Sequence, residues 1–213
     1  FPYTTLFRSL AAIVYFFFGA YWAVIPVVLA LYFAYFFRDF NRSMPYDPDI
    51  LYSPADGTVM GVEEIYDEEY LNEPALKLTI FLSVFNVHVN RSPIDGEIKY
   101  QRYTCGQFVP AYAKEASFEN ERHAIGMDNG RMRVLVIQVA GLLARRIVSW
   151  VTVGHDLKQG ERYGMIKFGS STELIVPKNV EITVKKGDTV VGGITVRSEE
   201  HTSELQSPRY LVC

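Results

Sequence analysis

Apolar and polar positions divide the chain into one long uncharged stretch near its start and many short alternating runs after it. Residues 10–37 carry no charged side chain and are rich in Phe, Tyr, Val, Ala and Leu. Because a helix of roughly 20 apolar residues spans the hydrocarbon of a bilayer, the pattern predicts a membrane anchor over residues 10–40. Gly19 and Pro26 interrupt it and leave two geometries open: one kinked, tilted span, or two short helices in a shallow hairpin.

The residues that follow this stretch indicate its orientation. Arg38 and Arg42 come directly after it, and basic residues tend to stay on the cytoplasmic side of a membrane. We therefore expect the anchor to hold the rest of the chain on the cytoplasmic side of the inner cell membrane.

From Leu51 onward the pattern changes to short apolar runs separated by Gly, Asp, Asn and Pro, which is typical of β-strands. The spacing of the runs favours a mainly β fold, a compact sandwich or barrel-like domain, over alternating strands and helices. A short helix is expected at 110–116. The predicted strands are 58–62, 76–83, 87–89, 97–103, 133–140, 146–151, 172–176, 181–184 and 195–196.

One short segment occurs twice. Ser-Pro-Ala-Asp-Gly at 53–57 is repeated as Ser-Pro-Ile-Asp-Gly at 92–96, and Lys-Gly-Asp at 186–188 is a looser relative. An Asp-Gly pair supplies a tight turn with positive φ before a strand. The repeat therefore predicts a duplicated β unit, with Asp95 as a structural turn residue.

Net charge and cysteine content bear on the partners and on the cell compartment of this protein. The formal net charge of −3 gives no argument for nucleic acid as a partner, and we expect no metal site.

Residues 1–9 and 197–213 read as translated sequencing-adapter sequence, so we expect 10–196 to be the natural fragment. Cys105 is the one cysteine of that fragment, which excludes an internal disulfide framework and fits a reducing compartment.

Six motifs follow one another between residues 36 and 170. They are FFRDFNR at 36–42, SPADG at 53–57, FLSVFNVHVNR at 81–91, NER at 120–122, VAGLLARRI at 139–147 and GERYGMIKFGS at 160–170. Together they resemble the short, bacterial and archaeal-type phosphatidylserine decarboxylase proenzymes, a pyruvoyl-dependent family. The resemblance covers nearly all of residues 36–196, and implies a decarboxylase domain over 41–196.

The resemblance implies a lyase that processes itself. The chain would be cut between Gly169 and Ser170, giving a β chain that ends at Gly169 and an α chain whose first residue becomes a pyruvoyl group. That group would form a Schiff base with the serine amine of phosphatidylserine and yield phosphatidylethanolamine and CO2. The implied partners are the substrate lipid, the bilayer, and the two chains as a heterodimer, with a higher homo-oligomer left open.

The residue types suit this chemistry. The Ser170 hydroxyl can attack the Gly169 carbonyl, and Gly169 has no side chain to block the approach. A weak hydroxyl nucleophile needs a base, and the base needs an orienting carboxylate. The resemblance assigns these roles to His88 and Asp56. An ordinary histidine pKa of about 6.5 would also let His88 protonate the carbon left by CO2 loss.

The chain departs from the family pattern three residues after His88. Longer members carry a second histidine three residues on, where this chain has Arg91. Either His88 serves both steps or another group helps. His123 and His155 are two other histidines that could provide this help, but we expect both to lie at the surface.

A second departure lies next to the expected cut. Ser171 stands where short members usually have arginine, so two adjacent serines leave the cut ambiguous by one residue. The glycine that precedes Ser170 favours Gly169–Ser170.

Basic residues are candidates for holding the lipid phosphate or the substrate carboxylate. Arg145 and Arg146 are adjacent, so on a strand their side chains point to opposite faces, and only one of the two can contact the lipid phosphate or the substrate carboxylate. Arg91 is a third candidate.

Two other functions stay open at this point. One is a non-catalytic, membrane-anchored β module built on the Asp-Gly repeat. The other keeps the enzyme but changes the lipid to another serine phospholipid such as archaetidylserine.

Overall fold

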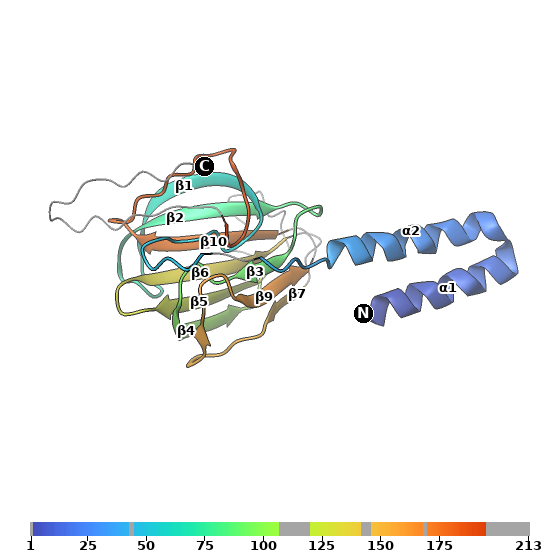
Figure 1. Ribbon diagram of the computed structural model, residues 1–213, viewed down its shortest axis with the longest axis horizontal. Helices are drawn as coiled ribbons and strands as arrows, with labels where there is room; N and C mark the ends of the chain where they lie inside the picture. The colour runs from blue at the N-terminus through green and yellow to red at the C-terminus, as the bar shows by residue number, and fades with distance from the viewer. Residues whose placement is uncertain (1, 43–44, 107–119, 142–145, 168–169, 195–213) are drawn as a thin grey trace.

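The protein consists of a helical hairpin attached to a β domain (Figure 1). The computed structural model describes residues 2–42, 45–106, 120–141, 146–167 and 170–194. The helices are α1 (Pro2–Phe18) and α2 (Ala20–Phe36). The strands are β1 (Gly57–Asp67), β2 (Glu73–Leu82), β3 (Val89–Arg91), β4 (Gly96–Thr104), β5 (Arg122–Asp128), β6 (Arg133–Ala140), β7 (Arg146–Ser149), β8 (Asp156–Leu157), β9 (Arg162–Lys167), β10 (Ser170–Pro177) and β11 (Thr189–Val190).

The two helices lie side by side and project away from the β domain (Figure 1). The chain reverses at Gly19, whose φ of 87° is in the left-handed region that glycine adopts readily. Of the two geometries that the sequence left open, the structure has the hairpin. Each helix has 17 residues, and neither helix of the described chain reaches the combined length and apolarity needed to cross a membrane.

Eight antiparallel strands form one sheet in the order β11-β1-β2-β10-β6-β5-β4-β8. This sheet curls into a half-barrel, and a smaller sheet, β3-β9-β7, lies near the base of α2 (Figure 1). The prediction of a mainly β fold is confirmed. β10 lies at the centre of the large sheet, paired with β2 on one side and β6 on the other.

Side chains of β10 alternate between two apolar layers, as the period of a strand requires. Leu174 and Val176 belong to the main core inside the curved sheet, together with Ile98 and Tyr163. Ile175 belongs to a smaller cluster on the other face. Because β10 is covered on both faces, its polar residues are buried as well.

The large sheet is built from two equivalent halves that meet between β10 and β6. Each half begins with the repeated segment, and in each the serine hydroxyl donates to the carbonyl two residues on. The distances are 2.7 Å from Ser53 Oγ to the Ala55 oxygen and 2.6 Å from Ser92 Oγ to the Ile94 oxygen. β1 and β4 also bulge at matching positions. The duplicated β unit is confirmed.

The expected positive φ is found at only one of the two repeated glycines. Gly96 has a φ of 152°, whereas Gly57 is not among the glycines with positive φ. Gly57 serves a close approach instead, because a Cβ there would lie 2.2 Å from the carbonyl oxygen of Phe81. The prediction of a positive-φ turn was therefore wrong at this position.

Some strand predictions also need correction. The alternation at 181–184 is real, since Ile182 and Val184 pack against the core, but the segment has no partner strand and is not a β-strand. Four strands were missed (β5, β8, β9 and β11), because glycines interrupt the pattern of β5 and β9 and the other two have only two residues. The predicted elements at 110–116 and 195–196 lie outside the described residues.

Candidate active site

Ser170 is the first residue of the central strand β10. Its backbone lies opposite Leu82 of β2 and Ala140 of β6. The side chain is fully buried, and its hydroxyl has no hydrogen-bond partner among the residues that the structure describes. A buried polar group without a partner costs about 1–3 kcal/mol, so this serine does not serve stability. Ser171 points to the opposite face of the strand, and Gly169 lies outside the described residues.

His88 is buried immediately before β3. Its Nδ1 lies 2.9 Å from the carbonyl oxygen of Asn86. Because a carbonyl can only accept, Nδ1 carries the proton and Nε2 carries a lone pair. Burial is the main cause that lowers the pKa of His88 from 6.5 to about 4, and the charge of Arg38 lowers it further. The expectation of an ordinary pKa was wrong: His88 is a neutral base at pH 7.

A side-chain hydrogen bond joins the segment of the predicted base to the strand of the predicted hydroxyl. β3 pairs with β9 so that Asn90 is opposite Gly164. Asn90 Nδ2 donates to Thr172 Oγ1 at 2.9 Å. His88 and Ser170 are two residues before Asn90 and Thr172, so each is two positions along the chain from this hydrogen bond.

Asp56 is held by an ion pair. Nη1 and Nη2 of Arg42 donate to its two carboxylate oxygens at 2.6 Å and 2.7 Å, and the backbone N–H of Gly192 donates to Oδ1 at 2.7 Å. The negative charge of Asp56 raises the pKa of His88, against the larger effect of burial. The orienting role predicted for Asp56 stays a prediction, and Arg42 is a partner that the sequence did not reveal.

Arg91 is buried, and its guanidinium binds the protein itself. It donates to the carbonyl oxygens of Gly160 at 3.2 Å and Phe40 at 2.8 Å, and to Oδ1 of Asp39 at 3.2 Å. These contacts fasten the segment after α2 to the β domain. Substrate binding by Arg91 stays a prediction that the described contacts do not favour.

Arginines gather in a hollow of about 500 Å³ beside Arg91. The lining residues are Asn41, Arg42, Arg91, Glu161 and Arg162. Acidic groups balance the cations, because Asp39 binds both Arg91 and Arg162 while Asp56 binds Arg42. The hollow therefore offers little net attraction for an anion.

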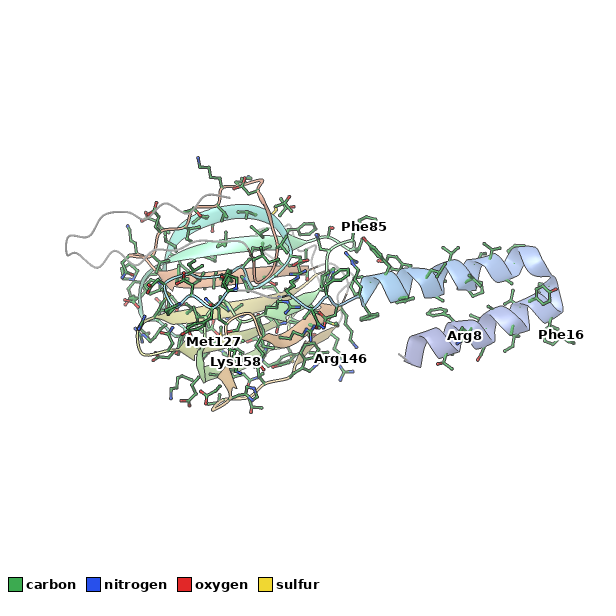
Figure 2. All side chains as sticks on the ribbon, in the orientation of Figure 1. Arg8, Phe16, Phe85, Met127, Arg146 and Lys158 are labelled. Atoms are coloured by element: carbon green, nitrogen blue, oxygen red, sulfur yellow. The ribbon has the colours of Figure 1, made fainter. Side chains whose placement is uncertain are left out.

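The remaining predicted residues have separate positions. Arg146 is exposed on the side of the β domain from which α2 projects, as is Phe85 (Figure 2). Arg145 lies outside the described residues. His155 is exposed, as predicted.

The prediction of a surface position was wrong for His123, which is buried between β4 and β6. Its Nδ1 donates to Gln138 Oε1 at 3.0 Å, and its Nε2 accepts from Gln101 at 2.9 Å. Burial lowers the pKa of His123, so this imidazole is neutral at pH 7 as well. No sequence pattern indicated the burial of His123, because its amide partners Gln101 and Gln138 are far from it along the chain.

The chain matches one known family over most of its length. A sequence model of the family "Phosphatidylserine decarboxylase" matches residues 29–198. The chain belongs to the phosphatidylserine decarboxylase family.

Individual relatives agree with this assignment. The phosphatidylserine decarboxylase proenzyme of Carboxydothermus hydrogenoformans is 50% identical over 170 residues, which cover 79% of this chain and 80% of the relative. That of Symbiobacterium thermophilum is 47% identical over 179 residues, or 83% of each chain. That of Syntrophus aciditrophicus is 40% identical over 195 residues, or 90% of this chain and 91% of the relative.

Membership of the phosphatidylserine decarboxylase family confirms the resemblance drawn from the six motifs. It makes the chain a decarboxylase, and therefore a carboxy-lyase. The name proenzyme describes these relatives as precursors that must be converted to the active form. The matched region contains Asp56, His88 and Ser170.

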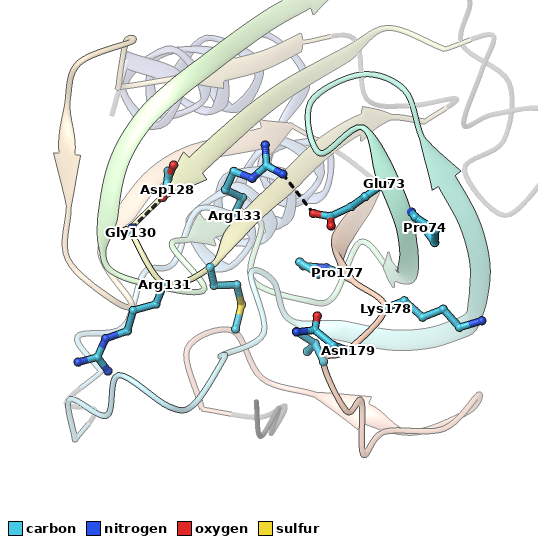
Figure 3. Close-up of a pocket in the computed structure, with 11 residues that line it drawn as sticks. Glu73, Pro74, Asp128, Gly130, Arg131, Arg133, Pro177, Lys178 and Asn179 are labelled. Carbon is cyan, nitrogen blue, oxygen red and sulfur yellow. Dashed lines mark hydrogen bonds and ion pairs between the residues drawn. The ribbon is translucent and has the colours of Figure 1, made fainter. Parts of the chain in front are cut away.

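A second hollow, of about 650 Å³, is remote from this decarboxylase site. It is lined by the far end of β10 with Pro177, by the turn after β5, and by the first residues of β2 and β6, Glu73 and Arg133 (Figure 3). Pro177 is seven residues beyond Ser170, which is roughly 23 Å along a strand. An ion pair between Arg133 and Glu73 crosses it, and we assign it no role in the reaction.

Proposed function

We propose that this chain is the precursor of a pyruvoyl-dependent phosphatidylserine decarboxylase, and that it cuts itself between Gly169 and Ser170. The observation that carries the proposal is the buried hydroxyl of Ser170 at the start of the central strand, which has no hydrogen-bond partner among the described residues. Ser170 is two residues before Thr172, and Thr172 accepts a hydrogen bond from Asn90, two residues after the neutral His88. Nucleophile and base are thus available without a preceding ionisation.

The first step is an N→O acyl shift. Ser170 Oγ attacks the carbonyl carbon of residue 169, the peptide C–N bond breaks, and an ester joins the two parts. His88 is the group that accepts the hydroxyl proton, since its Nε2 lone pair is in the basic state at neutral pH, and it passes this proton to the departing amine nitrogen of residue 170.

The second step converts the serine. A base removes the Cα proton of residue 170, the carboxylate of residue 169 leaves, and dehydroalanine remains. Water then hydrolyses this residue to a pyruvoyl group and ammonia, so the atoms balance without an external oxidant or reductant. A pyruvoyl group supplies an electron-withdrawing carbonyl that takes up the amine of the substrate serine and accepts the electrons left when CO2 departs.

His88 also suits the last proton transfer. It sits in the same buried environment, and after taking up a proton it is a strong acid, because burial disfavours its charged form. A protonated His88 would therefore deliver its proton readily to the substrate carbon. The chain has no second histidine at Arg91 to share the work, so we assign both proton transfers to His88.

We place the hairpin in the cytoplasmic leaflet of the inner membrane as an anchor. Its apolar side chains are exposed along both helices, with Phe16 at 82% and Trp22 at 61% exposure. Arg38, at the base of α2, stacks on the Tyr35 ring at 3.9 Å, a pairing suited to the membrane–water interface. Because both helix ends return to one side, the β domain remains on that side, next to a lipid substrate.

The proposal is tested on the full-length chain in detergent or lipid vesicles. Intact mass should give two chains, with a pyruvoyl terminus at residue 170, and phosphatidylserine should be converted to phosphatidylethanolamine and CO2. Ser170→Ala should remain one chain and be inactive, whereas Ser171→Ala should be cut at the same bond. A single uncut chain in an active preparation would rule the proposal out, and a panel of serine phospholipids would define the lipid.

A further inference from the structure

Four hydrogen bonds form one continuous chain through the β domain, and every residue in it except Gln101 is buried. Gln101 Nε2 donates to His123 Nε2 at 2.9 Å, and His123 Nδ1 donates to Gln138 Oε1 at 3.0 Å. Gln138 Nε2 donates to Asn90 Oδ1 at 2.8 Å, and Asn90 Nδ2 donates to Thr172 Oγ1 at 2.9 Å. Every bond runs in the same direction, so each group has a partner of the right kind.

This chain ends on β10, which begins with the proposed nucleophile, and on β3, which directly follows the proposed base. Asn90 is two residues after His88, and Thr172 is two residues after Ser170. β3 and β10 belong to different sheets, so no backbone ladder fixes one against the other. The side-chain bond between Asn90 and Thr172 is a direct tie between them.

Gln138 holds the Asn90 side chain in place for its hydrogen bond to Thr172. It lies on β6 directly opposite Thr172, and it is completely buried, as are Asn90 and Thr172. Gly164 of β9 lies against it, and a Cβ at that position would come within 2.6 Å of the Val148 carbonyl oxygen and 3.1 Å of Gln138 Nε2. The amides therefore sit in a closed space where an unmade hydrogen bond cannot be replaced by water.

We propose that Asn90 and Thr172, held by Gln138 and His123, are positioning residues for self-cleavage: they set the separation of His88 and Ser170. The inference rests on the proposed function. The acyl shift needs the hydroxyl and the base in contact geometry, and a displacement of about 1 Å at such a site can slow a reaction a hundredfold. The four hydrogen bonds prevent that displacement, although none of these side chains touches the reacting atoms.

The test compares three substitutions on one strand. Thr172→Val keeps the shape and removes the acceptor, whereas Thr172→Ser keeps the acceptor. Val176→Ala is the matched control, since Val176 is equally buried on the same face of β10, four residues further from the cut. Each full-length variant is made by cell-free synthesis with lipid vesicles, and the uncut fraction is followed by pulse and chase. Melting temperatures of the same variants in a Ser170→Ala background report stability.

Thr172→Val should slow cleavage roughly tenfold or more, while Thr172→Ser stays within about twofold of the unsubstituted chain. Val176→Ala should lower the melting temperature at least as much as Thr172→Val and still be cut at close to the normal rate. The inference is overturned if Thr172→Val is cut normally, or if Val176→Ala is slowed as much. An unsubstituted chain that never cuts would overturn the proposed function itself, which is a distinct result.

Discussion

The charge state of His88 follows from its immediate surroundings. The imidazole packs against the Phe36 ring with 4.5 Å between centroids, donates from Nδ1 to a backbone carbonyl, and is almost completely buried. Such an environment disfavours the imidazolium. At the residue scale His88 is therefore neutral at pH 7, which is the state that the proposed proton abstraction requires.

His88 should make the stability of the folded chain depend on pH. Its pKa is 6.5 in the unfolded chain and about 4 in the folded one. Between these values the unfolded chain binds more protons, so stability falls as the pH is lowered. We expect the His88 contribution to fall by about 2 kcal/mol between pH 7 and pH 5.

Urea unfolding in detergent can measure this contribution, with Ser170→Ala as the reference that is not cut. His88→Gln in the same background should lose less stability between the two pH values. Other titrating groups, His123 included, are common to both chains and cancel in the comparison. Equal losses would mean that the pKa of His88 is not lowered.

Asp56 and Arg42 give a second prediction at the residue scale. Both side chains are mostly buried, with exposures of 13% and 9%. Removing one charge leaves the other buried and unpaired, so Asp56→Asn and Arg42→Gln should each cost about 3 kcal/mol, measured by urea unfolding in the Ser170→Ala background.

Cleavage rates then separate two roles for Asp56. If its charge also supports His88, Asp56→Asn should slow cleavage more than Arg42→Gln at equal stability. Equal rates for the two variants would restrict Asp56 to holding Arg42 and Gly192.

At the scale of elements, α2 is connected directly to the proposed chemistry. Its last residue, Phe36, is buried against His88, whereas most described residues of the preceding turns are exposed or half-buried. The segment that follows is fastened by ion pairs from Asp39 to Arg91 and Arg162. The hairpin thus covers the base and keeps water from it.

Phe36→Ala should let water reach His88 and raise its pKa from about 4 toward 6.5. The rate of self-cleavage would then fall at a higher pH, because the protonated imidazole cannot accept the serine proton. The measurement is the pH profile of cleavage in pulse and chase.

Phe33→Ala is the matched control. Phe33 lies one turn earlier on α2, and its ring stacks on Phe7 with 5.0 Å between centroids. This variant should keep the midpoint of the unsubstituted chain. A Phe36→Ala profile with an unchanged midpoint would contradict the proposed role of the aromatic cover.

At the scale of the whole molecule, the central place of β10 decides what happens after the cut. The strand pairs with β2 through eight residues and with β6 through six, and β11, further along the same α chain, pairs with β1. These ladders and the core around Leu174 do not depend on the bond before Ser170.

The two chains should therefore stay together after processing. We expect them to co-elute in size-exclusion chromatography in mild detergent and to separate only in denaturing gels. The uncut Ser170→Ala chain should elute at the same volume. Release of the α chain under mild conditions would contradict the assembly proposed here.

Sequence reasoning worked where the signal is local. The β-rich pattern, the repeat at 53–57 and 92–96, the hairpin alternative and the six motifs are all read from neighbouring residues, whose spacing reflects backbone geometry. Strand alternation failed at 181–184, because it reports burial on one side and does not require a partner strand. The sequence pattern did not predict β9, because Gly164, which lets the Val148 carbonyl of β7 approach closely, interrupts its apolar alternation.

The sequence by itself determined the family, the duplicated β domain and the candidate residues Ser170, His88 and Asp56. Only the tertiary structure decided how those residues are held. Arg42 meets Asp56, and Asn90 meets Thr172 across 82 residues of chain. It also decided that His88 and His123 are neutral, since a pKa depends on burial and nearby charge. Such contacts join segments that only folding brings together, so a local sequence pattern cannot predict them.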